Sequence, residues 1–358
     1  MPSLKEIKGR INSISSTLAI TSAMKMVAAA KLQKAQMAIQ NMLPYERRLH
    51  SMLLDLMGAM NISAAASEDG SVRGSGSAER GFDQSGDRLS LSNQPDHTES
   101  EGAYSLMAQR QVRKVAIVAF ASNSSLCGAF NSNAIREATA VINEYRALGL
   151  GDADITVYSV GRKMAETMKK LGFPSPADFT KMSDSPSYEA ASALAQELFD
   201  GFVSGRFDKV ELVYNHYKST SSQPTIRQTY LPLSLADATA DLQAGKIADS
   251  ASESDTNRGA EPVGAPVVRQ GSPTTEDLIV EPSKEELIAT LLPKVVRLRV
   301  FTTLLDSAAA EHAARTVAMQ LATDNGNDLL QELTLEYNKG RQQKITSEIL
   351  DLVGGSMQ

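Results

Sequence analysis

Apolar or small residues recur along the first part of the chain at alternating spacings of three and four. The series runs Leu4, Ile7, Ile11, Ile14, Leu18, Thr21, Ala28, Leu32, Ala35, Ile39 and Met42. This heptad spacing places a seam along one side of a helix, and such a seam requires a partner helix along its length. The pattern predicts an N-terminal coiled-coil helix over residues 1–60, with a kink or break expected near Pro44.

The C-terminal end has the same helical character. No proline follows Pro293, and residues 294–358 form a second predicted coiled-coil helix. At about 1.5 Å per residue, a continuous helix of this length spans roughly 90 Å. A domain of ordinary size cannot contain such a rod, so the helix must project. Two projecting helices around a globular centre indicate a shaft or a lever.

The middle of the chain, over residues 110–244, alternates strand and helix patterns. Strands are expected at 114–121, 155–161, 209–217 and 225–232, and helices from Asn131, at 162–171 and at 187–203. Strands separated by helices imply crossover connections and a mostly parallel sheet. The expected fold class is therefore α/β, with a Rossmann-like domain beside the two long terminal helices.

Two segments, 64–102 and 245–276, are rich in serine, glycine and acidic residues and poor in apolar ones. Burial in such segments cannot offset the entropy lost on ordering, so both are predicted to be disordered insertions. Residues 277–293 are expected to return to the α/β domain and to start a helix at Pro282 and Ser283, with the long terminal helix beginning after Pro293.

Composition restricts the cellular compartment in which the protein is expected. The chain of 358 residues has one cysteine, Cys127, which excludes an intramolecular disulfide and fits a reducing compartment. No apolar run is long enough to cross a bilayer, and the helix pattern begins too early for a leader peptide. A soluble protein is expected, with only indirect membrane association.

The net charge of −6 conceals an asymmetry, because residues 1–48 carry +6 and the remainder −12 by direct count. A basic helix can meet nucleic acid, anionic lipid or an acidic protein surface, or simply be solvated. Nucleic acid is the weakest candidate, since aromatic and arginine residues are scarce along the seam.

Signatures of catalysis are missing from the sequence. Neither GxxxxGK[ST] nor GxGxxG occurs, and the four histidines lack metal-ligand spacing. Cys127 follows the first strand, where open α/β sheets often hold a site, but no adjacent base is apparent, so a packed residue is preferred. No catalytic, cofactor-binding or metal-binding residues are expected.

Several motifs, in the same order along the chain, closely resemble those of the gamma subunits of F-type ATP synthases. They are ITSAMKMVAAAKLQKAQ at 20–36, LCGAFNSN at 126–133, YNHYKS at 214–219, EPSKEEL at 281–287, AEHAARTVAMQLATDN at 310–325 and LTLEYNKGRQQKITSEILDLVGG at 333–355. The resemblance covers everything except the two low-complexity segments.

The resemblance implies a central rotating stalk with no bond chemistry of its own, a non-catalytic subunit of a proton-translocating ATP synthase. Its terminal helices would form an antiparallel coiled coil inside a ring of three alpha and three beta subunits. The α/β domain would contact an epsilon-type subunit and the membrane ring of c subunits, at the cytoplasmic face of a bacterial inner membrane. Ion flow would turn the c-ring and the stalk, which would drive the catalytic sites through their conformations.

The resemblance also assigns partner contacts to individual residues. Met24 and Lys25, where the seam is broken, would face acidic loops of the catalytic subunits. Arg341 and Gln342 match a pair that hydrogen-bonds a catalytic-subunit loop, with Thr346 nearby.

The last residues of the helix form an apolar tip that includes Ile349, Leu352 and Val353, and an exposed apolar end of this kind usually needs an enclosing surface.

Two features depart from the family. Asn123-Ser124-Ser125 replaces its usual Asp-Arg/Lys-Gly triplet, and segment 245–276 lacks the cysteine pair of the plant insertion. The alternative function is a small-molecule-binding α/β module that self-associates through its terminal helices.

Overall fold

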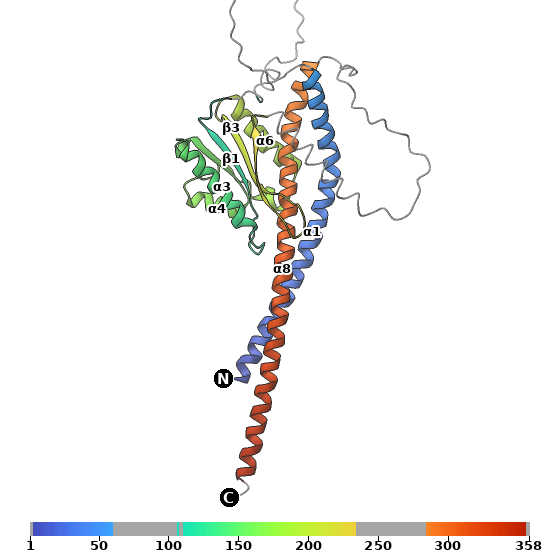
Figure 1. The fold of residues 1–358 in the computed structure, drawn as a ribbon, viewed down its shortest axis with the longest axis vertical. Helices are drawn as coiled ribbons and strands as arrows, with labels where there is room; N and C mark the ends of the chain where they lie inside the picture. Colours follow the sequence, from blue (N-terminus) through green and yellow to red (C-terminus); the bar gives the residue numbers. More distant parts are fainter. Residues whose placement is uncertain (1–2, 60–105, 107–109, 234–283, 356–358) are drawn as a thin grey trace, which may run out of the picture.

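The computed structural model describes residues 3–59, 106, 110–233 and 284–355 (Figure 1). Two long helices lie side by side, and an α/β domain packs against one half of the pair. The segments predicted to be disordered, 64–102 and 245–276, lie outside the described residues. No described helix is both long and apolar enough to cross a membrane.

The long helices are α1 (Leu4–Ala59) and α8 (Lys284–Gly355), and both contain a proline. A kink or break is expected near Pro44, and no break occurs, since α1 continues through this residue. A proline inside a helix costs about 3 kcal/mol, but Leu49 and Leu53 beyond it are buried in the core and hold the helix in place. The last helix likewise starts at Lys284, earlier than expected, and passes through Pro293 without interruption.

The central sheet has four strands in the order β2-β1-β3-β4. They are β1 (Val115–Phe120), β2 (Ile155–Val160), β3 (Lys209–Asn215) and β4 (Thr225–Leu231). β1 is parallel to both β2 and β3, and β4 joins β3 antiparallel. The predicted fold class, an α/β domain with a mostly parallel sheet beside long terminal helices, is therefore confirmed.

Helices cover both faces of the sheet. They are α3 (Phe130–Ala147), α4 (Arg162–Lys170), α5 (Thr180–Asp184) and α6 (Tyr188–Val203), with a 3-10 turn at Asp152–Asp154. Side chains alternate along β1, so Ile117 packs with α3 and α4 while Val118 packs with α6 and α8. The shaft helix α8 is thus a structural layer of the α/β domain.

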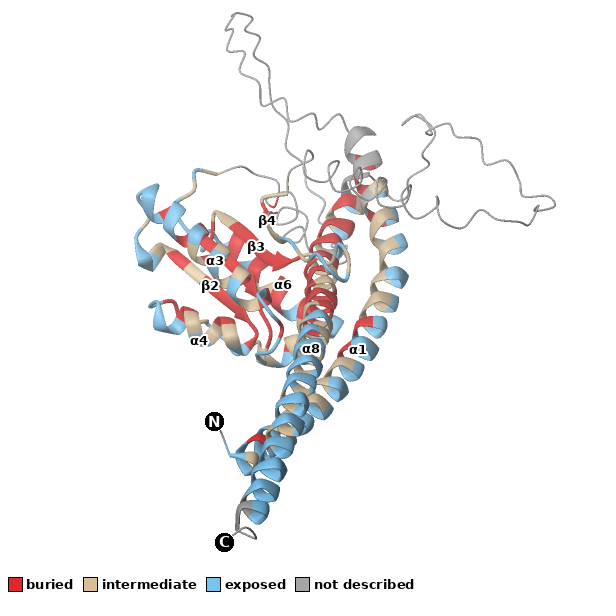
Figure 2. Cartoon of the chain, turned by 60° about the horizontal axis from the view of Figure 1, so that its bottom comes forward, coloured by how far each residue is buried: buried red, intermediate tan, exposed pale blue. Residues whose placement is uncertain are grey.

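Burial along α8 changes where the helix leaves the domain. Residues from Ile288 to Ala313 are mostly buried against the sheet, α6 and α1, whereas most side chains after Met319 are partly or fully exposed. Figure 2 shows this change along the two helices. One helix therefore serves first as domain core and then as projecting shaft.

Candidate functional site

The shaft is built from α1 and α8 in a regular antiparallel register. Leu18 lies on Gly326, and Leu4 lies on Gly340, where an added Cβ would stand 2.6 Å and 3.2 Å from the leucine Cδ2 atoms. The step from Leu4 to Leu18 equals the step from Gly340 back to Gly326, so the pairing does not slip. The Thr323 hydroxyl also donates to the Thr21 hydroxyl at 3.1 Å.

Met24 and Lys25 are half-buried on α1, next to this seam. The register places them opposite Met319 and Gln320 of α8. Among the described residues Lys25 forms no ion pair. On the same turn Met26 is 74% exposed, so this part of the shaft presents apolar and cationic groups outward together.

The end of α8 extends beyond its partner helix. Because Leu4 at the start of α1 meets Gly340, every later residue of α8 lies on a single unpaired helix (Figure 1). Arg341, Gln342 and Thr346 are exposed there, and the Thr346 hydroxyl donates to the Gln342 carbonyl at 2.9 Å.

The apolar tip continues this unpaired segment, with Ile349 55%, Leu352 75% and Val353 52% exposed. Met24 and Lys25 lie opposite a point on α8 that is about 20 residues before Arg341, a rise of roughly 30 Å along the helix. The structure therefore separates the predicted contact residues into two regions, one on the paired shaft and one on its end.

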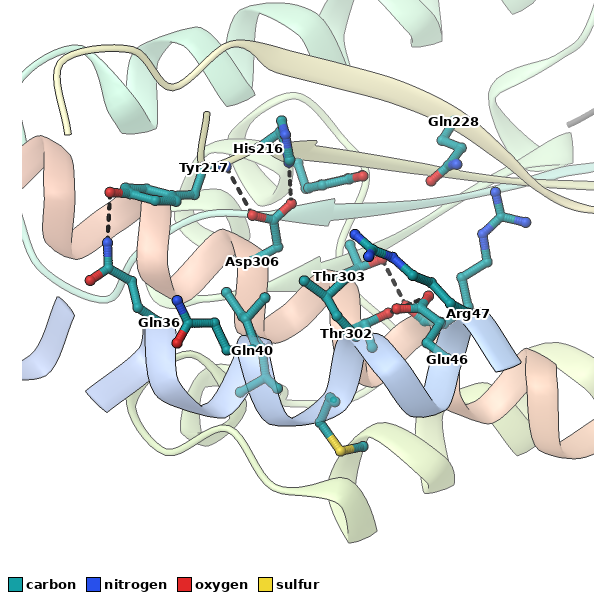
Figure 3. Close-up of a pocket in the computed structure, with 16 residues that line it drawn as sticks. Gln36, Gln40, Glu46, Arg47, His216, Tyr217, Gln228, Thr302, Thr303 and Asp306 are labelled. Carbon is teal, nitrogen blue, oxygen red and sulfur yellow. Dashed lines mark hydrogen bonds and ion pairs between the residues drawn. The ribbon is translucent and has the colours of Figure 1, made fainter. Parts of the chain in front are cut away.

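A third region, which the sequence did not reveal, joins the domain to the shaft. Asp306 of α8 accepts the backbone N–H of Tyr217 at 2.9 Å and contacts His216 Nδ1 at 2.6 Å. Gln36 of α1 donates to the Tyr217 hydroxyl at 2.6 Å (Figure 3). The hydrogen bond to Asp306 raises the pKa of His216, although burial opposes it. These contacts tie α1, α8 and the end of β3 together.

A second tether lies further along α8. Arg315 pairs with Glu311 at 2.7 Å, with both side chains largely buried, and its Nη2 donates to the Ser124 hydroxyl at 2.7 Å. Ser124 belongs to the Asn123-Ser124-Ser125 triplet, so this triplet supplies an acceptor for Arg315. Next to this pair, burial and the charges of Arg315 and Lys31 lower the pKa of His312 to about 4.

The crevice at the carboxyl ends of β1 and β3 is where open α/β sheets bind ligands, because the strand order reverses between these two strands. In this protein α8 fills it. Ala310 packs on Cys127 and Phe130, and the Asp306 carboxylate takes the backbone N–H that follows β3. Cys127 is 1% exposed, and its sulfur contacts polar atoms of Ser122, Ser124 and Asn131, as expected for a packed residue.

A cavity of about 530 Å³ lies beside the first tether, between α1, α8 and the β3–β4 edge (Figure 3). It is lined by amide, hydroxyl and charged side chains and has a partly apolar wall. Across the described residues, no group of three or more His, Cys, Asp or Glu side chains is arranged to hold a metal.

Sequence reasoning singled out the segments that contain His216 and Arg315 but gave these residues no role. The available signal was an aspartate, Asp306, inside the apolar run FTTLLDSAAA. Carboxylates are rarely buried without a partner. The sequence could not identify that partner, because His216 lies 90 positions away.

Comparison with known proteins agrees with this architecture. Residues 3–357 match the family model described as ATP synthase. The chain is 46% identical to the ATP synthase gamma chain of Phocaeicola vulgatus and 44% identical to that of Bacteroides thetaiotaomicron, in each case over 100% of both chains.

Among solved structures, the fold is similar to a chain of the rotor of the Euglena gracilis mitochondrial ATP synthase. The TM-score is 0.51 at 19% identity, covering 96% of this chain and 98% of that one. A second structure of the same Euglena enzyme, containing OSCP, F1 and the c-ring, gives a TM-score of 0.52 at 19% identity. The match covers 99% of this chain and 93% of that one. With the full-length bacterial matches, these findings lead to one conclusion: the chain belongs to the family of ATP synthase gamma chains.

Proposed function

We propose that this protein is the rotating central stalk of an F-type ATP synthase. It couples ion-driven rotation of a membrane c-ring to conformational changes in the nucleotide-binding subunits. Torque changes the relative stability of catalytic-site states and so does the work that differential ligand affinity does in other switches. The stalk contributes no catalytic residue of its own.

The observation that carries this proposal is the form of α8. Its first part is a buried layer of the α/β domain, its middle pairs with α1, and its last part is an exposed single helix. Torque applied to the domain therefore passes into the rod through continuous helix and packed side chains. The full-length relatives, which carry the gamma chain name, support the same assignment.

The contact residues take distinct roles in this scheme. Met24 and Lys25 meet acidic loops of the catalytic subunits at the collar. Arg341 and Gln342, with Thr346 one turn away, form charge-assisted hydrogen bonds with a catalytic-subunit loop, which suit a latch that forms and releases as the shaft turns. Arg341 and Gln342 are both exposed, which leaves their donors available.

The apolar tip, Ile349, Leu352 and Val353, turns inside an enclosing apolar sleeve formed by the three alpha and three beta subunits. The α/β domain meets the epsilon-type subunit and the c-ring. The stalk is thereby held at the cytoplasmic face of a bacterial inner membrane without crossing it. The absence of a spanning helix among the described residues is compatible with this peripheral attachment.

The alternative, a self-associating ligand-binding module, needs two free surfaces. It needs an unoccupied helical seam for a second copy and an open crevice at the sheet. The seam of α1 is instead covered by α8, and α8 also occupies the crevice at Cys127 and Phe130. The structure therefore favours the stalk.

The decisive experiment is native mass spectrometry of the complex that co-purifies with this chain from gently extracted membranes. The chain carries a tag in an exposed loop. One copy bound to three alpha and three beta subunits is the expected stoichiometry. A free chain or a stable homo-oligomer would favour the alternative.

A further inference from the structure

The first tether joins the α/β domain to the buried part of α8. This helix stays mostly buried as far as Ala313, and most of its side chains become exposed only after Met319. Of the two polar tethers between α8 and the domain, only the one at His216 pairs a carboxylate with a group that titrates near neutral pH. The other joins Arg315, Glu311 and the Ser124 hydroxyl.

We propose that His216 and Asp306 form a proton-dependent clasp between the α/β domain and the shaft, and that a rise in pH through the neutral range loosens this junction. The clasp is strongest with imidazolium facing carboxylate. After deprotonation, two contacts remain: the Tyr217 N–H bond to Asp306, and a neutral Nδ1–H bond if that tautomer is kept. The junction therefore loosens without releasing.

The direction of the pH effect follows from the direction in which the pKa of His216 is shifted. The pKa of His216 is raised above its usual 6.5, chiefly by its hydrogen bond to Asp306. A group with a raised folded-state pKa contributes its full stability below the unfolded pKa, and that contribution is lost as pH rises through the folded pKa. The sensitive window therefore begins at about pH 6.5 and extends upward.

Other charged groups surround the pair. Lys218, in the same loop, opposes protonation of His216, and burial opposes it as well. The cavity next to the clasp also carries Glu46 and Arg47 from α1 and Arg299 from α8, with the uncharged Gln228 from β4. These three charges are already engaged in interactions. Asp306 is thus the carboxylate that the imidazolium contacts directly.

The same cavity gives the clasp room to open. Its volume of about 530 Å³ is lined by His216, Tyr217 and Asp306, and also by Gln36 and Thr302 (Figure 3). Side chains at a close-packed junction cannot separate without a backbone shift. Here the polar groups can separate and become hydrated locally.

The test is a double-mutant cycle on the isolated full-length chain, with H216Q, D306N and the double variant unfolded by urea at about pH 6 and about pH 8.5. No ATP turnover is read, so the result is independent of the proposed rotary function. Because the His216 side chain is 44% exposed, solvent screening keeps the effect small. The coupling constant should be about two- to fivefold larger at the lower pH. Equal coupling between His216 and Asp306 at the two pH values, or no coupling at either, would overturn the clasp.

Two further measurements keep the result interpretable. S124A weakens the other tether, and its effect should not change between the two pH values. If D306N fails to fold, histidine NMR of the wild-type chain, assigned with H216Q, reports the His216 titration directly. A pKa above the ordinary histidine value supports the clasp, and one at or below that value overturns it.

Discussion

Leu18 of α1 packs directly on the backbone of Gly326 of α8, and a Cβ at Gly326 would stand 2.6 Å from Leu18 Cδ2. Glycine inside an exposed helix normally costs about 1 kcal/mol relative to alanine. The Leu18 side chain occupies the space that a Cβ at Gly326 would need. The seam therefore depends on a small residue that helix propensity alone would disfavour.

Gly326→Ala is expected to destabilise the isolated chain by about 1 kcal/mol, because overpacking at about 1–3 kcal/mol outweighs the gain in propensity. Thermal unfolding measures this loss of stability. Gly9→Ala is the matched control, since nothing lies within 4 Å of a Cβ there, and it should stabilise the chain. Adding Leu18→Ala to Gly326→Ala should restore part of the loss. Stabilisation by Gly326→Ala alone would show that the Leu18 side chain moves aside at little cost.

Glu211→Ala should be among the most damaging substitutions in the α/β domain. The Glu211 side chain is 2% exposed and contacts Lys209 at 2.6 Å, Arg227 at 2.7 Å and the Tyr145 hydroxyl at 2.6 Å. Burial alone would raise the pKa of Glu211, but these three partners outweigh it and lower the pKa. Removing the carboxylate leaves two cations without their buried partner, at a cost of about 3–5 kcal/mol in urea unfolding.

The control for that substitution is Glu144→Ala. Glu144 also contacts Arg227, but its side chain is 58% exposed. Ion pairs at such positions contribute at most about 1 kcal/mol. Equal losses for the two variants would mean that the Glu211 network is not a buried charge centre.

His312 is expected to make the chain acid-sensitive. Burial, Arg315 and Lys31 lower its pKa to about 4, whereas the unfolded chain has the ordinary value of about 6.5. The unfolded state therefore binds the proton first, and stability falls as pH drops from about 6.5 to about 4, by at most about 3 kcal/mol. His312→Gln should flatten this slope in urea unfolding. An unchanged slope would assign the acid sensitivity to other groups.

Arg341→Ala and Gln342→Ala should each lower coupled ATP turnover of the assembled complex by roughly tenfold, because a charge-assisted hydrogen bond at the latch is lost. Assembly, measured by native mass spectrometry, should change much less. Both side chains are exposed on the unpaired helix, so the stability of the isolated chain should not change. Gln343→Ala, on another face of the same turn, is the control. Parallel loss of assembly and turnover would make the pair structural.

The long-range pattern of the sequence was enough to predict the main elements. The heptad series from Leu4 to Met42 required a partner helix, and apolar runs such as that of β1 required a sheet covered on both faces. Hydrophobic periodicity reports on which side of an element is buried, so it transfers directly into a fold class. The prolines were harder to interpret: Pro44 and Pro293 both lie inside continuous helices, because packing beyond each proline outweighs its local cost.

By itself, the sequence determined the α/β class, the two long helices and the exposed polar and apolar groups near the C-terminus. Only the tertiary structure decided that α8 fills the crevice of its own sheet, that Leu18 meets Gly326, and that His216 meets Asp306. Hydrophobic periodicity is a local property that can be identified from the sequence alone. Contacts between residues far apart in sequence depend on register and crossing geometry, which exist only once the helices and the sheet have packed.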